Sequence, residues 1–277
     1  MALLFLCFFL SGCLVRRRVV APAGQRVPQP LLTASKDQLI QKIHRVFDPI
    51  QSFTMKIDMS PSVGGVYGGK VTDYPTITGF ILFLKPDDIR VVGLDPVIHS
   101  TAFDMASSGN DFHVLIPSKN EFIEGRNDSQ PTSKNKLENL RPAAFLSALL
   151  INPPASGDIS LVQDDTNETK AIYILMIIGR NGDQYFPIRN VYFDRYTLQI
   201  NRQKTFDSEG NILSETKYTN WTDHNGIQFP SVIDITRPKD GYEVVISVTD
   251  LKLNAGDIDA GKFVLNAPPG AQQKTLQ

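Results

Sequence analysis

A run of glycines after residue 63 is the first place where residue spacing could support chemistry. Residues 64–71 read Gly-Gly-Val-Tyr-Gly-Gly-Lys-Val and nearly match a phosphate-binding loop. Val71 stands where that loop needs a hydroxyl for Mg²⁺, and no helix pattern follows to direct an N-terminus at a phosphate. The segment 61–75 is therefore predicted to be a mobile, glycine-rich loop and not a nucleotide site.

The other residue types that serve catalysis are scattered. The histidines are His44, His99, His113 and His224. None forms a spaced pair on one element, although His99 and His113 could approach each other across strands, and neither H-E-x-x-H nor G-x-S-x-G occurs. Asp104, Asp111 and the Asp257/Asp259 pair fit strand ends and turns. The sequence favours a protein that is not an enzyme and uses neither metal nor cofactor, with a hydrolase acting on lipids or glycans as the least favoured alternative.

Cys13 is the remaining residue with chemistry of its own, and it follows an uncharged apolar run. Residues 1–15 are too short to span about 30 Å of hydrocarbon, which takes roughly 20 apolar residues, but they fit the core of a secretory signal. Leu10-Ser11-Gly12-Cys13 resembles the lipobox of bacterial lipoprotein signals. That resemblance implies diacylglycerol (and acyl chains such as palmitate) on Cys13 and cleavage after residue 12. A buried cysteine or a plain membrane anchor is the alternative.

Composition limits the partners and the compartment. The net charge of −1 gives no nucleic-acid footprint. Cys7 would leave with the signal and Cys13 would be acylated, so no disulfide or thiolate metal site remains. The triplet Arg16–Arg18 is either a basic patch on anionic headgroups or a solvated charge run. Leu14 follows the cysteine where an aspartate would retain bacterial lipoproteins in the inner membrane, so the resemblance favours the outer membrane, facing the periplasm.

Two helices are predicted. Ser35 and Gln38 form a capping box before apolar residues at helical spacing, which predicts a helix over 36–48. Pro142 precedes a short apolar helix over 141–150, bounded by Pro153 and Pro154. Residues 13–34, with three prolines, read as a tether, 126–139 as a polar loop, and the tail over 269–277 as loose.

Strands dominate the rest of the chain. Period-two or apolar runs between turn residues predict strands at 53–59, 76–84, 89–94, 97–105, 112–116, 121–124, 159–163, 171–178, 188–193, 198–206, 212–220, 227–236 and 242–251. Short connections make this an antiparallel meander, and a sheet this long must curl, close or split. The predicted fold class is mainly β (α+β): one curved antiparallel sheet forming a half-barrel, with helices across its open concave side.

Four stretches resemble the LolA/LolB superfamily of lipoprotein carriers. They are 52–57 after the first helix, 79–90 with its Lys-Pro turn and Arg90, 109–117, and 206–230, and the likeness spans about residues 35–268. The resemblance implies an incomplete barrel, capped by helices, that holds acyl chains in an apolar cavity. The lipid anchor makes the chain more similar to membrane-bound LolB than to soluble LolA.

Two strands, 80–84 and 171–178, are apolar on both faces and are predicted to be covered on both sides. A core plus a helix, or a core plus a ligand cavity, would cover them. Candidate lining residues are Phe53, Met55, Met59, Phe103, Met105, Phe145, Leu149 and Met176. Methionine suits a site that adapts to different acyl chains, whereas plain core packing is the alternative for each residue.

The sequence thus predicts a signal peptide at 1–12, an acylated tether at 13–34 and a lipid-binding domain at 35–268. Its partners would be the membrane, the acyl chains of lipids or lipoproteins, and a periplasmic carrier or envelope protein, with no nucleic acid. Transport of lipid or lipoprotein toward the outer membrane is the favoured function. A protein-interaction or envelope-stress-sensing module on the same fold is the rival.

Overall fold

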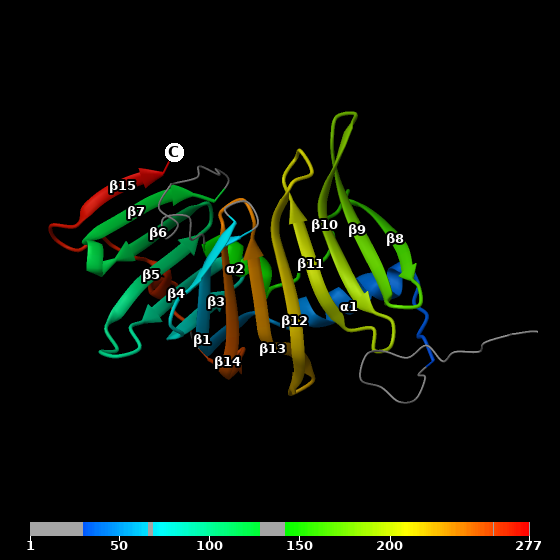
Figure 1. The fold of residues 1–277 in the computed structure, drawn as a ribbon, viewed down its shortest axis with the longest axis horizontal. Helices are drawn as coiled ribbons and strands as arrows, with labels where there is room; N and C mark the ends of the chain where they lie inside the picture. Colours follow the sequence, from blue (N-terminus) through cyan, green and yellow to red (C-terminus); the bar gives the residue numbers. More distant parts are fainter. Residues whose placement is uncertain (1–29, 66–68, 128–141, 257, 277) are drawn as a thin grey trace, which may run out of the picture.

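The computed structural model describes residues 30–65, 69–127, 142–256 and 258–276. Within them, fifteen strands form one open sheet (Figure 1). The predicted class, a mainly β half-barrel with helices, is confirmed. The signal peptide, Cys13, the triplet Arg16–Arg18 and most of the predicted loop over 126–139 lie outside the described residues.

Thirteen of the fifteen strands follow the predicted order with shifted bounds, and the two at 70–73 and 272–276 were not predicted. The fifteen strands are β1 (Ser52–Gly65), β2 (Lys70–Asp73), β3 (Ile77–Leu84), β4 (Asp88–Leu94), β5 (Thr101–Ser108), β6 (Asp111–Ile116), β7 (Glu121–Arg126), β8 (Ile159–Thr166), β9 (Ala171–Asn181), β10 (Gln184–Asp194), β11 (Ile200–Phe206), β12 (Ile212–His224), β13 (Ile227–Arg237), β14 (Tyr242–Leu253) and β15 (Gln272–Leu276). The helices are α1 (Lys36–Phe47), α2 (Pro142–Leu149) and the short 3-10 turns η1 (Pro117–Lys119) and η3 (Ala260–Phe263).

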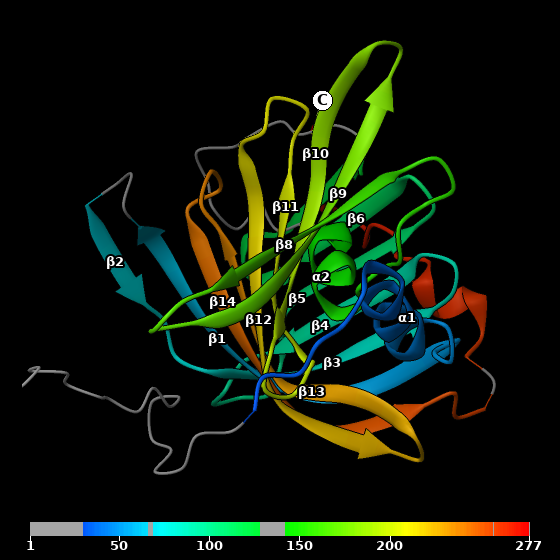
Figure 2. The ribbon, with the colours of Figure 1, turned by 90° about the vertical axis from the view of Figure 1, so that its right-hand side faces the viewer.

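The sheet consists of two meanders joined along one seam. Its order is β15-β7-β6-β5-β4-β3-β1-β14-β13-β12-β11-β10-β9-β8, with β2 paired to β1. The seam is the antiparallel pair β1–β14, which joins strands far apart in the sequence. The turned view shows the sheet curling around α2, with α1 beside it (Figure 2). Because the ends β15 and β8 do not meet, the barrel stays open.

Helix α1 forms where its sequence signals predict. The Ser35 hydroxyl accepts from the Gln38 amide, and the Gln38 side chain accepts from the Ser35 amide, so the capping box is present. The helix buries Leu39 and Ile43. At its C-terminus the Lys85 ammonium donates to the carbonyls of Phe47 (3.0 Å) and Asp48 (3.2 Å), which lack helical partners. Partial burial of that ammonium lowers the pKa of Lys85.

One main core fills the concave side of the sheet. It includes the buried face of α1, the apolar residues of α2 and inward-facing residues from both meanders. A smaller cluster of Ala106, Phe122 and Leu265 lies elsewhere and brings the C-terminal segment onto the sheet. There Arg90 pairs with Asp104 through two hydrogen bonds (2.9 and 2.7 Å) and donates to the Lys262 carbonyl (2.8 Å).

Three local predictions are wrong. Residues 61–65 and 70–73 form the paired strands β1 and β2 and not a loop, because Gly64 and Gly65 adopt positive φ and let β2 approach. A Cβ on Gly64 would overlap the Lys70 carbonyl. The C-terminal tail is not loose over 272–276, since β15 pairs in parallel with β7. Residues 97–99 form a turn and not the start of a strand.

Candidate functional site

The predicted lining residues gather on the concave side, with one exception. Six of them, Phe53, Met55, Met59, Met105, Phe145 and Leu149, are buried in the main core, and Phe103 packs against its margin. Met176 instead lies between the inward-facing, fully buried Leu175 and Ile177 on β9, so strand alternation turns it to the outer face. Seven of the eight candidates therefore share one face.

Helix α2 packs into this concave side as an apolar plug. None of its eight residues is exposed, and Phe145, Ala148 and Leu149 are buried. It packs against β4, β5 and β13. Two side chains of the sheet hold its last turn: Gln203 Nε2 donates to the Ser147 carbonyl (2.5 Å), and the Tyr218 hydroxyl donates to the Ala148 carbonyl (2.8 Å). If this helix moved, it would uncover apolar surface on both sides of the contact.

A band of polar side chains crosses the concave face under the end of α2. Gln203 on β11 and Ser214, Thr216 and Tyr218 on β12 are buried, and Arg189 lies beside them on β10. Thr205 and Ser214 are joined by a hydrogen bond of 2.9 Å. The sequence analysis missed this band, although Gln203, Thr205, Ser214 and Thr216 show polar residues at every second position of neighbouring strands. Burial of its phenol raises the pKa of Tyr218.

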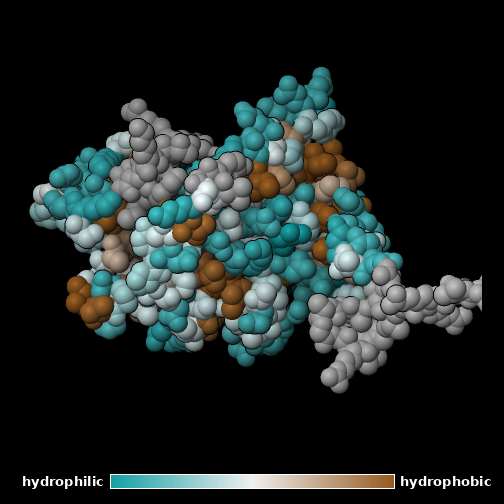
Figure 3. Space-filling model, viewed as in Figure 1, coloured by the Kyte–Doolittle hydropathy of each residue, from teal (hydrophilic) through white to brown (hydrophobic). Residues whose placement is uncertain are grey.

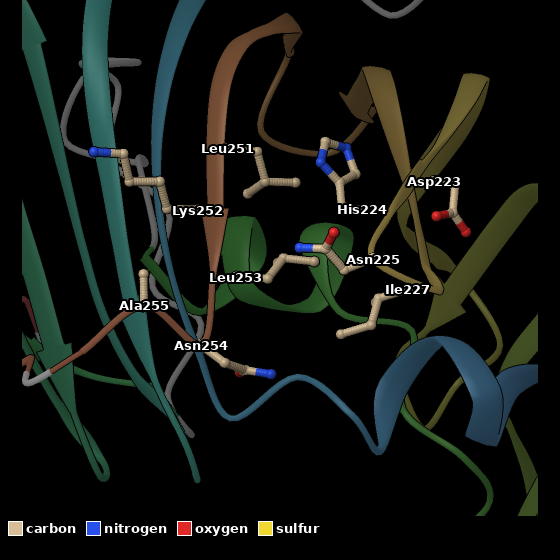
Figure 4. A pocket seen from close by; sticks show the side chains of 9 residues that line it. All are labelled: Asp223, His224, Asn225, Ile227, Leu251, Lys252, Leu253, Asn254 and Ala255. Carbon is tan, nitrogen blue, oxygen red and sulfur yellow. The ribbon is translucent and has the colours of Figure 1, made fainter.

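A pocket of about 560 Å³ opens where the sheet splits. The pairing of β13 with β14 ends at Val232 and Ser247, while β14 continues along β1 to Leu253. Figure 4 shows Ile227, Leu251 and Leu253 on either side of this gap, with Lys252 and Asp223 turned away. These three apolar residues pack against the main core, so the gap leads toward it. The remaining lining residues are His224, Asn225, Asn254 and Ala255, and no predicted lining residue is among them.

The turn between β4 and β5 presents two apolar side chains to solvent. Val97 is 82% exposed and Ile98 is 73% exposed. The Asp95 carboxylate accepts from both of their amides, at 2.8 and 3.0 Å, and these bonds lower the pKa of Asp95. The turn is thus locally ordered, and its apolar tip stands out at the lower left of Figure 3. Sequence analysis placed Val97 in a strand and missed this feature, although Asp95-Pro96 marked the turn.

Of the two strands that are apolar on both faces, β9 has no exposed residue over 171–178, whereas β3 is not fully covered on its outer face. Phe80 on β3 alternates with the buried Ile81 and is 37% exposed, so the prediction is wrong there. On the edge strand β8, Ile159 is 39% exposed and Leu161 is 49% exposed, next to the outward Met176. Figure 3 shows apolar atoms at the surface over this end of the sheet.

The described residues form neither a metal-binding cluster nor a membrane-spanning helix. No group of three or more His, Cys, Asp or Glu residues is placed to hold a metal ion, and His113 stacks on Phe122 at 5.4 Å between ring centres. Within the same part of the chain, no helix is both long and apolar enough to cross a membrane.

Comparison with known proteins identifies the fold. No protein-family model and no curated protein matches the sequence. A LolA superfamily protein from Nitrosomonas europaea aligns with a TM-score of 0.54 at 14% identity, over 84% of this chain and 99% of that one. A putative outer membrane lipoprotein-sorting protein domain from Vibrio parahaemolyticus gives 0.54 at 12% identity, over 83% and 97%. A DUF1329 family protein from Desulfovibrio piger gives 0.53 at 17% identity, over 83% and 97%.

These proteins define the class to which the architecture belongs. The chain has a LolA-like fold, the fold of lipoprotein-sorting proteins, as the sequence resemblance implied. At identities of 12–17% these comparisons establish the fold alone.

Proposed function

We propose that this protein is a lipid-anchored protein of the bacterial cell envelope that binds a lipid or an acylated client on the concave side of its sheet. It would do so without catalysis. The observation that carries the proposal is α2, a helix that is apolar apart from Ser147 and is held in the concavity by apolar packing and two side-chain hydrogen bonds. Each buried methylene of a ligand contributes about 0.8 kcal/mol, so a few acyl chains could replace the packing of α2.

Two features support membrane attachment. Cys13 would carry diacylglycerol, as its lipobox implies, and stable anchoring takes two or more acyl chains. The β4–β5 turn, which carries the exposed Val97 and Ile98, and the beginning of the described chain both lie on the lower side of Figure 1, at opposite ends of the sheet. An anchored molecule could therefore bring the tip to the membrane surface, the position from which a lipid or lipoprotein client would be transferred. The outer membrane is the proposed location.

A search for bound lipid tests the binding proposal. The full chain carrying Cys13→Ser is purified without detergent, so that no attached acyl chain remains, and extracted lipids are identified by mass spectrometry. We expect lipid at close to one molecule per protein. Protein that is folded by circular dichroism, yet lipid-free and unable to take up added lipid, would contradict the proposal.

Metabolic labelling tests the anchor. Labelled fatty acid should be incorporated into the parent and not into Cys13→Ser, because a serine hydroxyl is a far weaker nucleophile than a thiolate. The parent should need detergent for extraction, whereas the variant should leave membranes in high salt, which screens any attraction of Arg16–Arg18. If the variant stays bound after the salt wash, the apolar segment itself is the anchor.

The edge strand β8 favours a second candidate function, protein interaction. An unpaired strand edge with exposed apolar side chains is a common site of strand addition by a partner. Replacing Leu161 with Lys should then abolish pull-down of an envelope partner while leaving lipid content unchanged. Loss of lipid without loss of a partner would count against this second function.

A further inference from the structure

Arg189 is a largely buried cation that has no ion-pair partner among the described residues. It lies on β10, opposite the fully buried Ile177 of β9 and opposite Thr205 of β11, so its side chain belongs to the concave face. Its Nε atom is buried and has no hydrogen-bond partner, and it forms no ion pair with a described residue. Burial lowers the pKa of Arg189, and the electrostatic influence of Tyr218 and of the Asp158 carboxylate offsets only part of that effect.

An unpaired buried charge is costly, because the protein interior cannot replace the water that solvated it. The position of Arg189 at the margin of an apolar concavity is therefore unfavourable for stability and suggests a role in binding. Beside it Gln203 Oε1 is also buried without a partner. The polar band therefore contains hydrogen-bonding groups, among them Arg189 Nε and Gln203 Oε1, that have no partner while α2 lies in the concavity.

The donors near Arg189 converge on the last turn of α2. Gln203 Nε2 from β11 and the Tyr218 hydroxyl from β12 donate to carbonyl oxygens of that turn, and Arg189 interacts electrostatically with Tyr218. Carbonyl oxygens at a helix C-terminus carry partial negative charge. With α2 in the concavity, the Ser147 and Ala148 carbonyls accept the hydrogen bonds of Gln203 and Tyr218. A fully charged anion would be a stronger acceptor for the same two donors.

We propose that the polar band is the headgroup site of the ligand, with Arg189 as its charged member. The ligand class is a single- or double-chain amphiphile with an anionic phosphate or carboxylate. Its headgroup oxygens would take the donors of Gln203, Tyr218 and Arg189 in place of the Ser147 and Ala148 carbonyls, and its chains would lie along the apolar part of the concavity. This inference rests on the proposed lipid binding. A purely apolar cavity would bind lipids with different headgroups equally well, whereas the polar band would favour anionic ones.

Two matched pairs of amphiphiles test the site with the full-length Cys13→Ser chain. Oleate is compared with oleyl alcohol for the carboxylate, and oleoyl lysophosphatidate with monooleoylglycerol for the phosphate, at submicellar concentrations. We expect the anionic member of at least one pair to bind at least about ten-fold more tightly, since charge-assisted hydrogen bonds are stronger than neutral ones. The pair that shows the preference identifies the headgroup.

Arg189→Met links the preference to the residue. It should reduce the preference to less than about two-fold with the affinity for the neutral amphiphile unchanged, and the urea midpoint should stay or rise, because an unpaired buried charge is removed. The matched control is Arg202→Gln, since Arg202 pairs with Glu215 and lies over the Tyr192 ring at 4.1 Å. It should keep the preference.

Three results would overturn the inference. They are a preference that survives Arg189→Met, a parent that binds neutral and anionic amphiphiles alike, and a marked loss of stability in Arg189→Met, which would make Arg189 a structural partner of α2. In the second case lipid binding stands and the headgroup site fails. A folded parent that binds none of the four amphiphiles refutes the proposed function together with this inference.

Discussion

The concave face of the sheet has two linings that differ in chemistry and in what they require. Around β1, β3 and β4 it is apolar and closely packed, with the rings of Phe53 and Phe83 4.9 Å apart between centres. Across β10 to β12 it carries the polar band of Arg189, Gln203 and Tyr218. Both regions contact α2. The apolar region contributes buried apolar surface, whose stabilising effect does not depend on direction, and the polar band contributes hydrogen bonds, which do.

The difference shows how one helix can be both stable and removable. Apolar packing of α2 can be replaced by any apolar chain of similar volume, because the hydrophobic effect has no direction. The two hydrogen bonds to Ser147 and Ala148 can be replaced only by groups that bring acceptors to the same place. The apolar region would thus determine most of the affinity for a ligand, and the polar band would determine the selectivity among ligands.

The largest effect is expected in the apolar region. Phe83→Ala should lower the free energy of unfolding by about 3–5 kcal/mol, because the side chain is fully buried and leaves a cavity. The matched control on the same strand is Phe80→Ala, whose ring is 37% exposed on the outer face and should cost far less. Urea unfolding at pH 7 measures both, and equal losses would show that the two faces of β3 are equally packed.

A smaller effect is expected in the polar band. Tyr218→Phe should cost about 1–3 kcal/mol, because it leaves the Ala148 carbonyl buried without its donor. It should also loosen the last turn of α2, seen as faster amide exchange over 145–150. Tyr192→Phe is the control, since it removes a hydroxyl that makes no bond within the described chain. If α2 exchanges equally slowly in both variants, the polar band does not hold the helix.

The smallest effect is a dependence on pH. Burial raises the pKa of Tyr218 above its ordinary value of 10.0, so the folded protein keeps a proton that the unfolded chain loses. Stability should therefore fall as the pH rises above that value, by about 1 kcal/mol between pH 10 and 11. Comparing the parent with Tyr218→Phe isolates this term from other groups. Parallel pH profiles of the two proteins would show that the phenol is accessible to water.

Patterns of residues in sequence were enough for most of the fold. The capping box at Ser35 and Gln38 located α1, because it acts within one turn of chain. Period-two alternation located most of the strands, since most strands have one buried face. Glycines were less informative: Gly64 and Gly65 permitted a tight strand pair where the composition alone indicated a loop.

The candidate site depended on contacts that local patterns do not contain. The sequence marked Phe53, Met55 and Phe145 as apolar, but whether an apolar residue faces a cavity or a neighbouring side chain is decided by how α2 packs. For Met176 only the register of β9 showed that it faces outward.

The polar band arises from three strands brought side by side, and its meeting with α2 spans 56 positions between Ser147 and Gln203 and 70 between Ala148 and Tyr218. Helix and strand formation follow largely from neighbours in the chain, which is why most elements and the fold class could be predicted from residue patterns. The surroundings of Arg189 and the direction of the Gln203 and Tyr218 donors follow from neighbours in space, which no pattern along the chain contains.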